Sequence, residues 1–303
     1  MRALVTGGAG FIGSHIVEAL LARGDEVHVV DDLSKGKREQ VPAAAALHVH
    51  DIREPLDAIV RESGAQGIVH LAAQADVRVS VGEPAFDAAV NVLGTVNVLE
   101  AARLVDARVV FASTGGAIYG ECERPAREND PLRPLSPYGA AKLAGEGYLG
   151  AFGRLYDAPH VSLRFGNVYG PRQDPHGEAG VVAIFLGRLR DGTACRIFGD
   201  GSQSRDYVYV EDVARATVAA LDGDPGGVFN VGTGTATSVL ELYDICRSTV
   251  GTDATAVHEA ARPGELGRSV LDGALAATTL GFRARTALAS GIAMTWESIR
   301  TDR

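Results

Sequence analysis

A tyrosine and a lysine separated by three residues are the first candidates for chemistry in this sequence. Tyr138 and Lys142 follow Ser136 and Pro137, which are favoured at the N-cap and first position of a helix. One helical turn would then place both side chains on the same face. A phenol titrates near pH ~10, but the lysine ammonium and the helix N-terminus would lower its pKa. The pair therefore predicts a general base that acts on a hydroxyl group.

A Tyr-x-x-x-Lys pair also occurs on ordinary helix surfaces, so the elements around it must decide between the two interpretations. Near the N-terminus, the apolar residues 3–5 lead into a turn with Gly7, Gly10 and Gly13, and helical apolar spacing follows over Gly13–Ala22. Glycines at this spacing permit a tight turn and a close approach of the backbone to a pyrophosphate. The free N–H groups of the helix N-terminus would face the phosphates. This segment predicts a dinucleotide-binding site.

An acidic residue ends the next predicted strand, Glu26–Val30. Asp31 could accept both hydroxyls of an adenosine ribose and would repel a 2′-phosphate. The sequence therefore favours NAD over NADP as the cofactor. The alternative is that Asp31 only caps a loop.

Strand and helix patterns alternate through the first half of the chain. This alternation predicts a parallel sheet with helices on both faces. The further predicted strands are Arg2–Val5, Leu47–His50, Gly67–Leu71, Val109–Ala112 and Val161–Phe165, and the further predicted helices include Pro84–Val105 and Pro137–Tyr156. The predicted fold class is α/β, a Rossmann-type doubly wound parallel sheet with a smaller C-terminal α/β substrate-binding lobe.

The pattern loosens after about Asn167, where Gly and Pro become frequent. We expect residues 1–167 to form an NAD-binding domain and residues 168–303 a smaller substrate-binding lobe, with a segment of about 204–235 returning to the first domain. The lobe would pack over the carboxyl ends of the strands, where open α/β sheets bind ligands.

Composition excludes several classes of function. The chain has 303 residues and a net charge of -9, without a basic run that could follow a phosphate backbone, so nucleic acid is not an expected partner. No apolar stretch is long enough to span a membrane, and no signal peptide is expected. Cys122, Cys195 and Cys246 are odd in number and widely spaced, which indicates free thiols and a cytoplasmic protein. The histidines show no metal-ligand spacing.

These features together resemble the extended short-chain dehydrogenase/reductase family, and within it the nucleotide-sugar epimerases of the UDP-glucose (UDP-galactose) 4-epimerase type. The resemblance covers nearly the whole chain. It is carried by Thr6–Gly13, residues 31–38, residues 51–52, His70–Gln74, Asn91, Ser113–Gly120, Tyr138 with Lys142, Arg164–Arg172, Arg205–Tyr207 and Arg262–Glu265.

The resemblance implies a role for each matching residue. The NAD site would comprise Gly7, Gly10, Phe11, Ile12, Asp31, Lys35, Asp51, Ile52, Leu71, Ala72, Ala73, Gln74, Tyr138 and Lys142. The UDP-sugar site would comprise Thr114, Asn167, Val182, Arg196, Phe198, Arg205, Tyr207, Arg262 and Glu265. Thr114 would bridge the sugar O4 and the tyrosine. The segment up to Tyr119 is one residue longer than in many relatives, so counting back from Tyr119 would place this position at Gly115. The strand end fixes the geometry better and favours Thr114, with Ser113 as the alternative catalytic hydroxyl.

The implied activity is C4 epimerisation of UDP-glucose and UDP-galactose through a transient 4-keto sugar, in a homodimer built from helices around Asn91–Arg103 and Tyr138–Tyr156. UDP-glucuronate and N-acetylhexosamines are alternative substrates. A 4,6-dehydratase or decarboxylase is a second alternative, although Thr114 is followed by Gly115-Gly116 where a dehydratase would carry acids. A non-catalytic NAD-sensing protein is a third, although such proteins tend to lack the Tyr/Lys pair.

Overall fold

Seven parallel strands form the central sheet of the computed structural model, which describes residues 1–175, 180–262 and 264–301. Pro263 of the Arg262–Glu265 segment lies outside these residues. The strand order is β11-β6-β5-β4-β1-β2-β3. The strands are β1 (Arg2–Thr6), β2 (Glu26–Asp31), β3 (Ala46–Val49), β4 (Gly67–His70), β5 (Arg108–Thr114), β6 (Val161–Phe165) and β11 (Gly227–Val231). The predicted doubly wound parallel sheet is confirmed, and the six predicted strands end within two residues of the observed ones.

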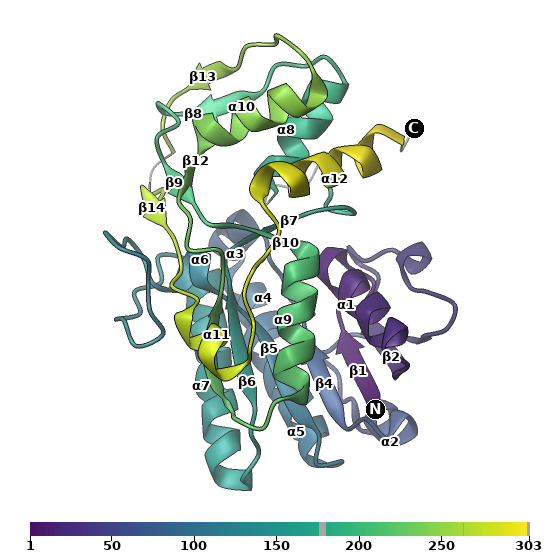
Figure 1. Ribbon diagram of the computed structural model, residues 1–303. Helices are drawn as coiled ribbons and strands as arrows, with labels where there is room; N and C mark the ends of the chain where they lie inside the picture. Colours follow the sequence, from purple (N-terminus) through teal and green to yellow (C-terminus); the bar gives the residue numbers. More distant parts are fainter. Residues whose placement is uncertain (176–179, 263, 302–303) are drawn as a thin grey trace.

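Helices cover both faces of the sheet because alternate strand residues point to opposite sides. Val5 packs in a core with helices α1 (Phe11–Ala22) and α9 (Val210–Asp222), whereas its neighbour Leu4 packs in the opposite core. That second core is closed by the helices α2 (Asp57–Ser63), α5 (Gly94–Arg103) and α7 (Pro137–Tyr156). Figure 1 shows α9 in front of the sheet, directly below the second lobe.

The predicted helix Pro84–Val105 is not a single helix. It consists of α4 (Pro84–Ala88), a π-helical turn η2 (Ala89–Leu93) and α5. The wide turn carries Asn91, whose side chain donates to the Gln74 carbonyl and accepts from the Gln74 N–H. Short π-helical turns of this kind are frequent at functional sites.

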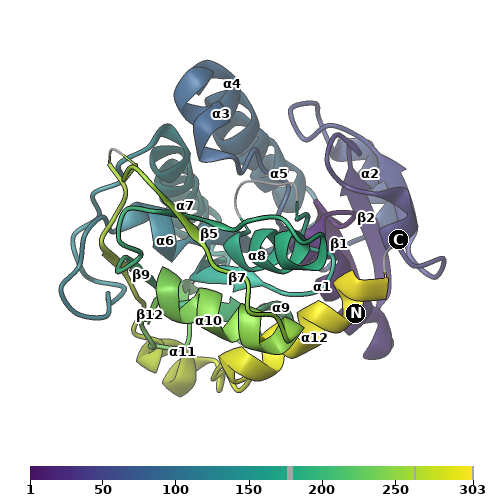
Figure 2. The ribbon, with the colours of Figure 1, turned by 90° about the horizontal axis from the view of Figure 1, so that it is seen from above.

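The second lobe lies over the carboxyl ends of the sheet strands (Figures 1 and 2). Its chain segments are β7 (Asn167–Tyr169), α8 (Val181–Arg190), β8 (Arg196–Phe198), β9 (Ser204–Arg205), β10 (Tyr207–Tyr209), β12 (Thr237–Ser238), α10 (Val239–Val250), β13 (Val257–Glu259), β14 (Arg268–Ser269) and α12 (Leu288–Thr301). The remaining elements are η1 (Arg38–Gln40), α3 (Val77–Gly82), α6 (Gly115–Ile118) and α11 (Ala274–Thr279). No helix in the described part of the chain is long and apolar enough to cross a membrane.

The chain crosses between the two parts more than once. After β10 it forms α9 against the sheet and then β11, which pairs in parallel with β6 from Gly227–Val231 to Val161–Phe165. It then returns to the lobe at β12. The edge of the central sheet is therefore completed by a segment late in the sequence.

Candidate active site

The glycine turn is packed so tightly that only glycine fits at two of its positions. A Cβ on Gly13 would collide with the carbonyl oxygen of Gly7. Gly7 itself has a φ of +71°, and a Cβ there would lie 2.7 Å from the backbone nitrogen of Ala72. Gly10, the N-cap of α1, offers no side chain to the first N–H groups of the helix. The turn thus presents backbone donors and a positive helix end, as a pyrophosphate requires.

Asp31 connects the end of β2 to this turn. One carboxylate oxygen accepts the N–H of Ala9 at 3.0 Å, and the other accepts the N–H of Leu33 at 2.9 Å. Burial raises the pKa of the carboxyl group, and the two backbone N–H groups oppose that change. Asp31 therefore does hold a loop, and its position beside the turn is also the one that a ribose-binding carboxylate needs.

The loop after β4 is fixed by a buried chain of hydrogen bonds that the sequence did not predict. His70 Nδ1 lies 2.7 Å from the hydroxyl of Thr6, and His70 Nε2 lies 3.0 Å from the hydroxyl of Thr95. The Thr6 hydroxyl also accepts the N–H of Ala72, and the Thr95 hydroxyl donates to the Asn91 carbonyl. Burial lowers the pKa of His70 to about 3, so the ring is neutral near pH 7. These hydrogen bonds hold the loop Leu71–Gln74 against the glycine turn.

Three further predicted cofactor residues follow β2 and β3. Lys35 is exposed, and Ile52 is buried against Gly94 of α5. Asp51 is paired with Arg53, whose hydrogen bonds lower the pKa of the carboxyl group. The structure thus leaves Lys35 accessible and gives Asp51 and Ile52 structural contacts.

Tyr138 and Lys142 lie one turn apart on α7, as predicted. Ser136 caps this helix by accepting the N–H of Gly139 at 3.2 Å. The Lys142 ammonium is buried and lies 6.0 Å from the centre of the Tyr138 ring and 4.8 Å from that of Phe111. Neither the Tyr138 hydroxyl nor the Lys142 ammonium forms a hydrogen bond within the described residues.

The expected lowering of the tyrosine pKa is not found in this structure. Burial, with a smaller contribution from the negative charge of Asp87, raises the pKa of Tyr138 to about 12. Burial also lowers the pKa of Lys142 to about 8. Burial therefore dominates both pKa values, and the Lys142 ammonium lies over the Phe111 ring without a hydrogen bond to the Tyr138 hydroxyl in the described part of the chain.

The two candidate hydroxyls at the end of β5 differ in their surroundings. Ser113 donates to the Glu146 carboxylate at 2.5 Å, and Glu146 forms a buried two-pronged ion pair with Arg164. Thr114 is half-buried, and its hydroxyl has no hydrogen-bond partner in the described part of the chain. Ser113 is therefore engaged in the core, while Thr114 is available to a ligand.

Thr114 and Asn167 face a common open position above Gly116. A Cβ placed on Gly116 would lie 3.6 Å from Oδ1 of Asn167 and 3.9 Å from Oγ1 of Thr114, with nothing closer. The sheet brings these residues together, since β6 lies beside β5 and the chain passes directly from β6 to β7. Gly116 thus leaves space between a hydroxyl and an amide, whereas Gly115 is packed against the Leu271 side chain.

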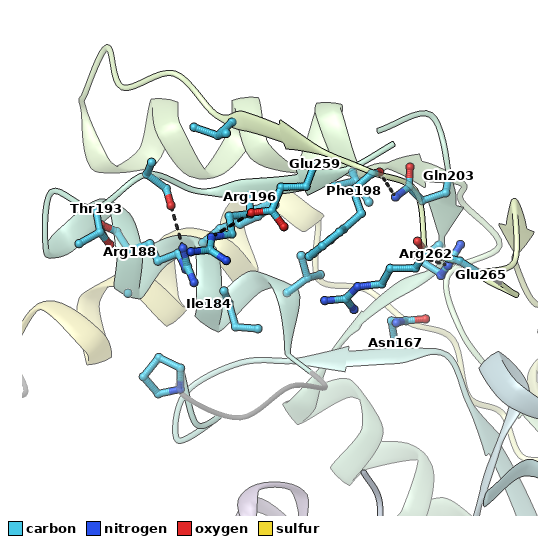
Figure 3. A pocket seen from close by; sticks show the side chains of 18 of the residues that line it. Asn167, Ile184, Arg188, Thr193, Arg196, Phe198, Gln203, Glu259, Arg262 and Glu265 are labelled. Carbon is cyan, nitrogen blue, oxygen red and sulfur yellow. Dashed lines mark hydrogen bonds and ion pairs between the residues drawn. The ribbon is translucent and has the colours of Figure 1, made fainter. Parts of the chain in front are cut away.

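A cavity of about 1070 Å³ opens from Asn167 into the lobe, between α8 and the β8–β13 pair (Figure 3). Seven predicted residues line it: Asn167, Arg196, Phe198, Arg205, Tyr207, Arg262 and Glu265. Val182 does not, because its side chain is buried in the core of the lobe, whereas Val181 and Ile184 line the cavity. Sequence reasoning also missed Arg188, Gln203 and Glu259 as lining residues.

Two arginines in this cavity are held by specific contacts. The Arg262 guanidinium lies 3.8 Å from the centre of the Phe198 ring and extends into the cavity toward Asn167 (Figure 3). Arg205 lies 3.4 Å from the Glu265 carboxylate. A guanidinium fork suits a diphosphate, and its stacking on an aromatic ring preorganises it.

The sequence profile of the NAD dependent epimerase/dehydratase family matches residues 3–232. The chain belongs to this family. It is 47% identical to a UDP-glucose 4-epimerase of Mycolicibacterium smegmatis, over 99% of each chain. It is similar to the structure of a Thermotoga maritima UDP-glucose 4-epimerase with UDP-glucose, at 44% identity over 99% of each chain and a TM-score of 0.97. It is also similar to a Thermus thermophilus UDP-glucose 4-epimerase in complex with NAD, at 47% identity over the full length of both chains and a TM-score of 0.95.

Membership of this epimerase family confirms the predicted relationship and the predicted cofactor, NAD. The geometry agrees with that cofactor. In this family member, the glycine turn, Asp31 and the loop Leu71–Gln74 meet at the carboxyl ends of β1, β2 and β4, and Tyr138 and Lys142 approach from α7. The unpaired polar groups of Thr114, Tyr138 and Lys142 can all be satisfied by a bound cofactor and sugar.

Proposed function

We propose that this protein is an NAD-dependent 4-epimerase that interconverts UDP-glucose and UDP-galactose. One observation carries the proposal: Thr114, Tyr138 and Lys142 have unpaired polar groups at the end of the sheet, and the arginine-lined cavity opens beside them. The names of the relatives with 44 to 47% identity support the choice of sugar.

The cofactor would be held by the predicted NAD-site residues, from the glycine turn to Lys142. NAD, when bound, supplies a reversible hydride acceptor. Tyr138 takes the proton of the sugar C4 hydroxyl, with Thr114 bridging the two oxygens, and a 4-keto sugar results. Tyr138 later returns the proton to the same oxygen. Lys142 holds positive charge beside the phenol, which favours the phenolate that the transfer needs.

Arg196, Phe198, Arg205, Tyr207, Arg262 and Glu265 would hold the uridine diphosphate. Val182 would then contribute through its helix rather than through its side chain, since that side chain is buried. The hexose would lie near Asn167 and Gly116, where the open position leaves it free to turn and present its other face. Firm binding of the diphosphate and loose binding of the sugar are what inversion at C4 requires.

A homodimer is part of the proposal. The exposed apolar side chains Val81, Phe86, Leu93, Tyr148 and Leu155 lie on α3, α4, η2 and α7, the region in which the family resemblance implies an interface. Grouped apolar exposure of this kind is typical of association surfaces. We also propose a cytoplasmic location and the division at residue 167 into a cofactor-binding domain and a sugar-binding lobe.

Isotope labelling tests the reaction. UDP-glucose deuterated at C4 should give UDP-galactose with the label retained, because the hydrogen leaves and returns within one closed site. UDP-glucose deuterated at C5 is the matched control, since a 4,6-dehydratase would release that label to solvent. Accumulation of NADH or of a 4-keto-6-deoxy sugar would refute epimerisation, whereas turnover of UDP-glucuronate alone would change only the substrate.

A further inference from the structure

Asp87 is a buried carboxylate that the proposed mechanism does not use. It lies on α4 and is 1% exposed. Its Oδ1 accepts from the side-chain amides of Gln74 at 2.9 Å and Asn91 at 3.0 Å. Its Oδ2 is buried and has no hydrogen-bond partner in the described part of the chain. Hydrogen bonds from two neutral amides do not offset the burial of this negative charge, because burying an ion without a counter-charge costs roughly several kcal/mol.

The missing counter-charge lies on the neighbouring helix. α4 and the π-helical turn both pack against α7, which carries Lys142. Lys142 is 3% exposed, and within the described residues no carboxylate forms an ion pair with its ammonium. Two opposite charges are therefore buried on helices that pack against each other, each without a direct ionic partner in the described part of the chain.

The other charged or titratable groups around this interface do not replace Asp87. Tyr138 lies on α7 beside Lys142, and His70 faces Lys142 from β4 but is neutral near pH 7. Glu146, one turn further along α7, is fully engaged by Arg164 and Ser113. Asp87 is the one described group whose charge acts on both Tyr138 and Lys142.

We propose that Asp87 is a positioning residue whose negative charge keeps the buried Lys142 ammonium protonated at neutral pH beside Tyr138. The proposal builds on the assignment of Tyr138 and Lys142 as the catalytic pair. Burial alone drives the pKa of Lys142 downward, and the Asp87 carboxylate opposes that change. The same negative charge raises the pKa of Tyr138, so Asp87 raises the pKa values of both Lys142 and Tyr138. The hydrogen bonds from Gln74 and Asn91 fix the position of the Asp87 carboxylate beside the loop after β4.

A direct titration of Lys142 tests this without cofactor, substrate or turnover. The chain has three lysines, Lys35, Lys37 and Lys142, so ¹³C-lysine labelling gives a spectrum in which each Cε signal can be followed with pH. Loss of one signal in Lys142→Met assigns it. In Asp87→Asn the Lys142 midpoint should fall by about one pH unit or more, as expected for removal of a nearby opposite charge.

The control is Asp212→Asn, which removes an equally buried carboxylate from α9, where Asp212 pairs with Arg215. It should leave the Lys142 midpoint unchanged. An unchanged midpoint in folded Asp87→Asn would overturn the proposal. If Asp87→Asn does not fold, Asp87→Ser replaces it, since its hydroxyl can still accept from Gln74 and Asn91 while the charge is lost. The Lys142 midpoint should again fall, and an unchanged midpoint would equally overturn the proposal.

Turnover gives a second measurement. In Asp87→Asn, the rising and the falling limb of the pH dependence of kcat should both move to lower pH. The KM for the UDP-sugar should be unchanged. A lower kcat with an unmoved profile would indicate a purely structural role. Failure of the proposed epimerase activity would appear instead as no turnover in the parent protein, while the lysine titration would still report on Asp87.

Discussion

The sheet half and the lobe build their parts of the site from different materials. At the ends of β1, β2 and β4 the site consists of backbone N–H groups, glycines and short side chains, all fixed by contacts with the main chain. In the lobe it consists of long arginine side chains held by a ring and by carboxylates. The first arrangement suits a cofactor that stays bound, and the second suits a ligand that enters and leaves.

The difference also determines how each half responds to substitution. In the sheet half a single methyl group on Gly7 or Gly13 meets the backbone, which cannot move aside cheaply. In the lobe, loss of a guanidinium removes charge and hydrogen bonds but leaves the strands in place. We therefore expect chemistry and cofactor choice to follow the sheet half, and affinity for the nucleotide sugar to follow the lobe.

The largest expected effect is that of Tyr138→Phe. Loss of the general base should lower kcat roughly a hundredfold or more, while the Kd of the UDP-sugar stays nearly unchanged. Stopped-flow turnover and calorimetric binding measure the two quantities. Tyr156→Phe on the same helix is the control, since its ring contacts with Phe152 and Arg103 remain. Near-normal turnover in Tyr138→Phe would remove the tyrosine from the mechanism.

Arg262→Ala should have the converse effect. Charged hydrogen bonds contribute about 1.5–3 kcal/mol, so binding of UDP should weaken about 10- to 100-fold while NAD binding is unaffected. Calorimetry with UDP and with NAD separates the two. Arg247→Ala, on the exposed side of α10, is the matched control. An equal loss of UDP and NAD affinity would contradict the assignment of cofactor binding to the sheet half and of nucleotide-sugar binding to the lobe.

A paired substitution at the end of β5 sharpens the choice of catalytic hydroxyl. Thr114→Ala should lower kcat about tenfold or more with little change in stability. Ser113→Ala should instead lower the free energy of unfolding by about 1–3 kcal/mol, because Glu146 loses a buried donor. Turnover assays and urea unfolding distinguish them. The reverse pattern would assign the role to Ser113.

Asp31→Asn should have the smallest effect, a narrowing of the preference for NAD over NADP by about tenfold. The amide oxygen can still accept one backbone N–H, so the turn should keep its shape. Competition binding of the two cofactors measures the ratio. Asp32→Asn, its exposed neighbour, should leave the ratio unchanged. A parent protein that binds both cofactors equally would contradict the role given to Asp31.

The parts of the site that sequence analysis predicted are those set by local geometry. The glycine turn, the end of β5 and the capped start of α7 each depend on a few consecutive residues. The face that α8 turns to the cavity could not be predicted, because residues 181–186 are all apolar and carry no helical period. That Val181, not Val182, lines the cavity depends on packing against distant elements.

Long-range electrostatics escaped prediction for a similar reason. A Tyr-x-x-x-Lys pair indicates which side chains are neighbours but not how strongly burial acts on them, so the raised pKa of Tyr138 was not foreseen. Nor did the helical pattern of Pro84–Val105 reveal the π-helical turn, since that turn is stabilised by contacts of Asn91 with the loop after β4. The stacking of Arg262 on Phe198 likewise joins segments from separate elements.

The late arrival of β11 bears on how the protein is synthesised. Until residue 231 has left the ribosome, β6 has an unpaired edge, and one face of the sheet lacks α9. Exposed strand edges and apolar faces favour aggregation of nascent chains. The lobe segment from β7 to β9 therefore leaves the ribosome before the sheet beneath it is complete. Ribosome-bound chains that expose residues up to about 170 outside the exit tunnel should be protease-sensitive in β6, whereas those that expose residues up to about 235 should protect it.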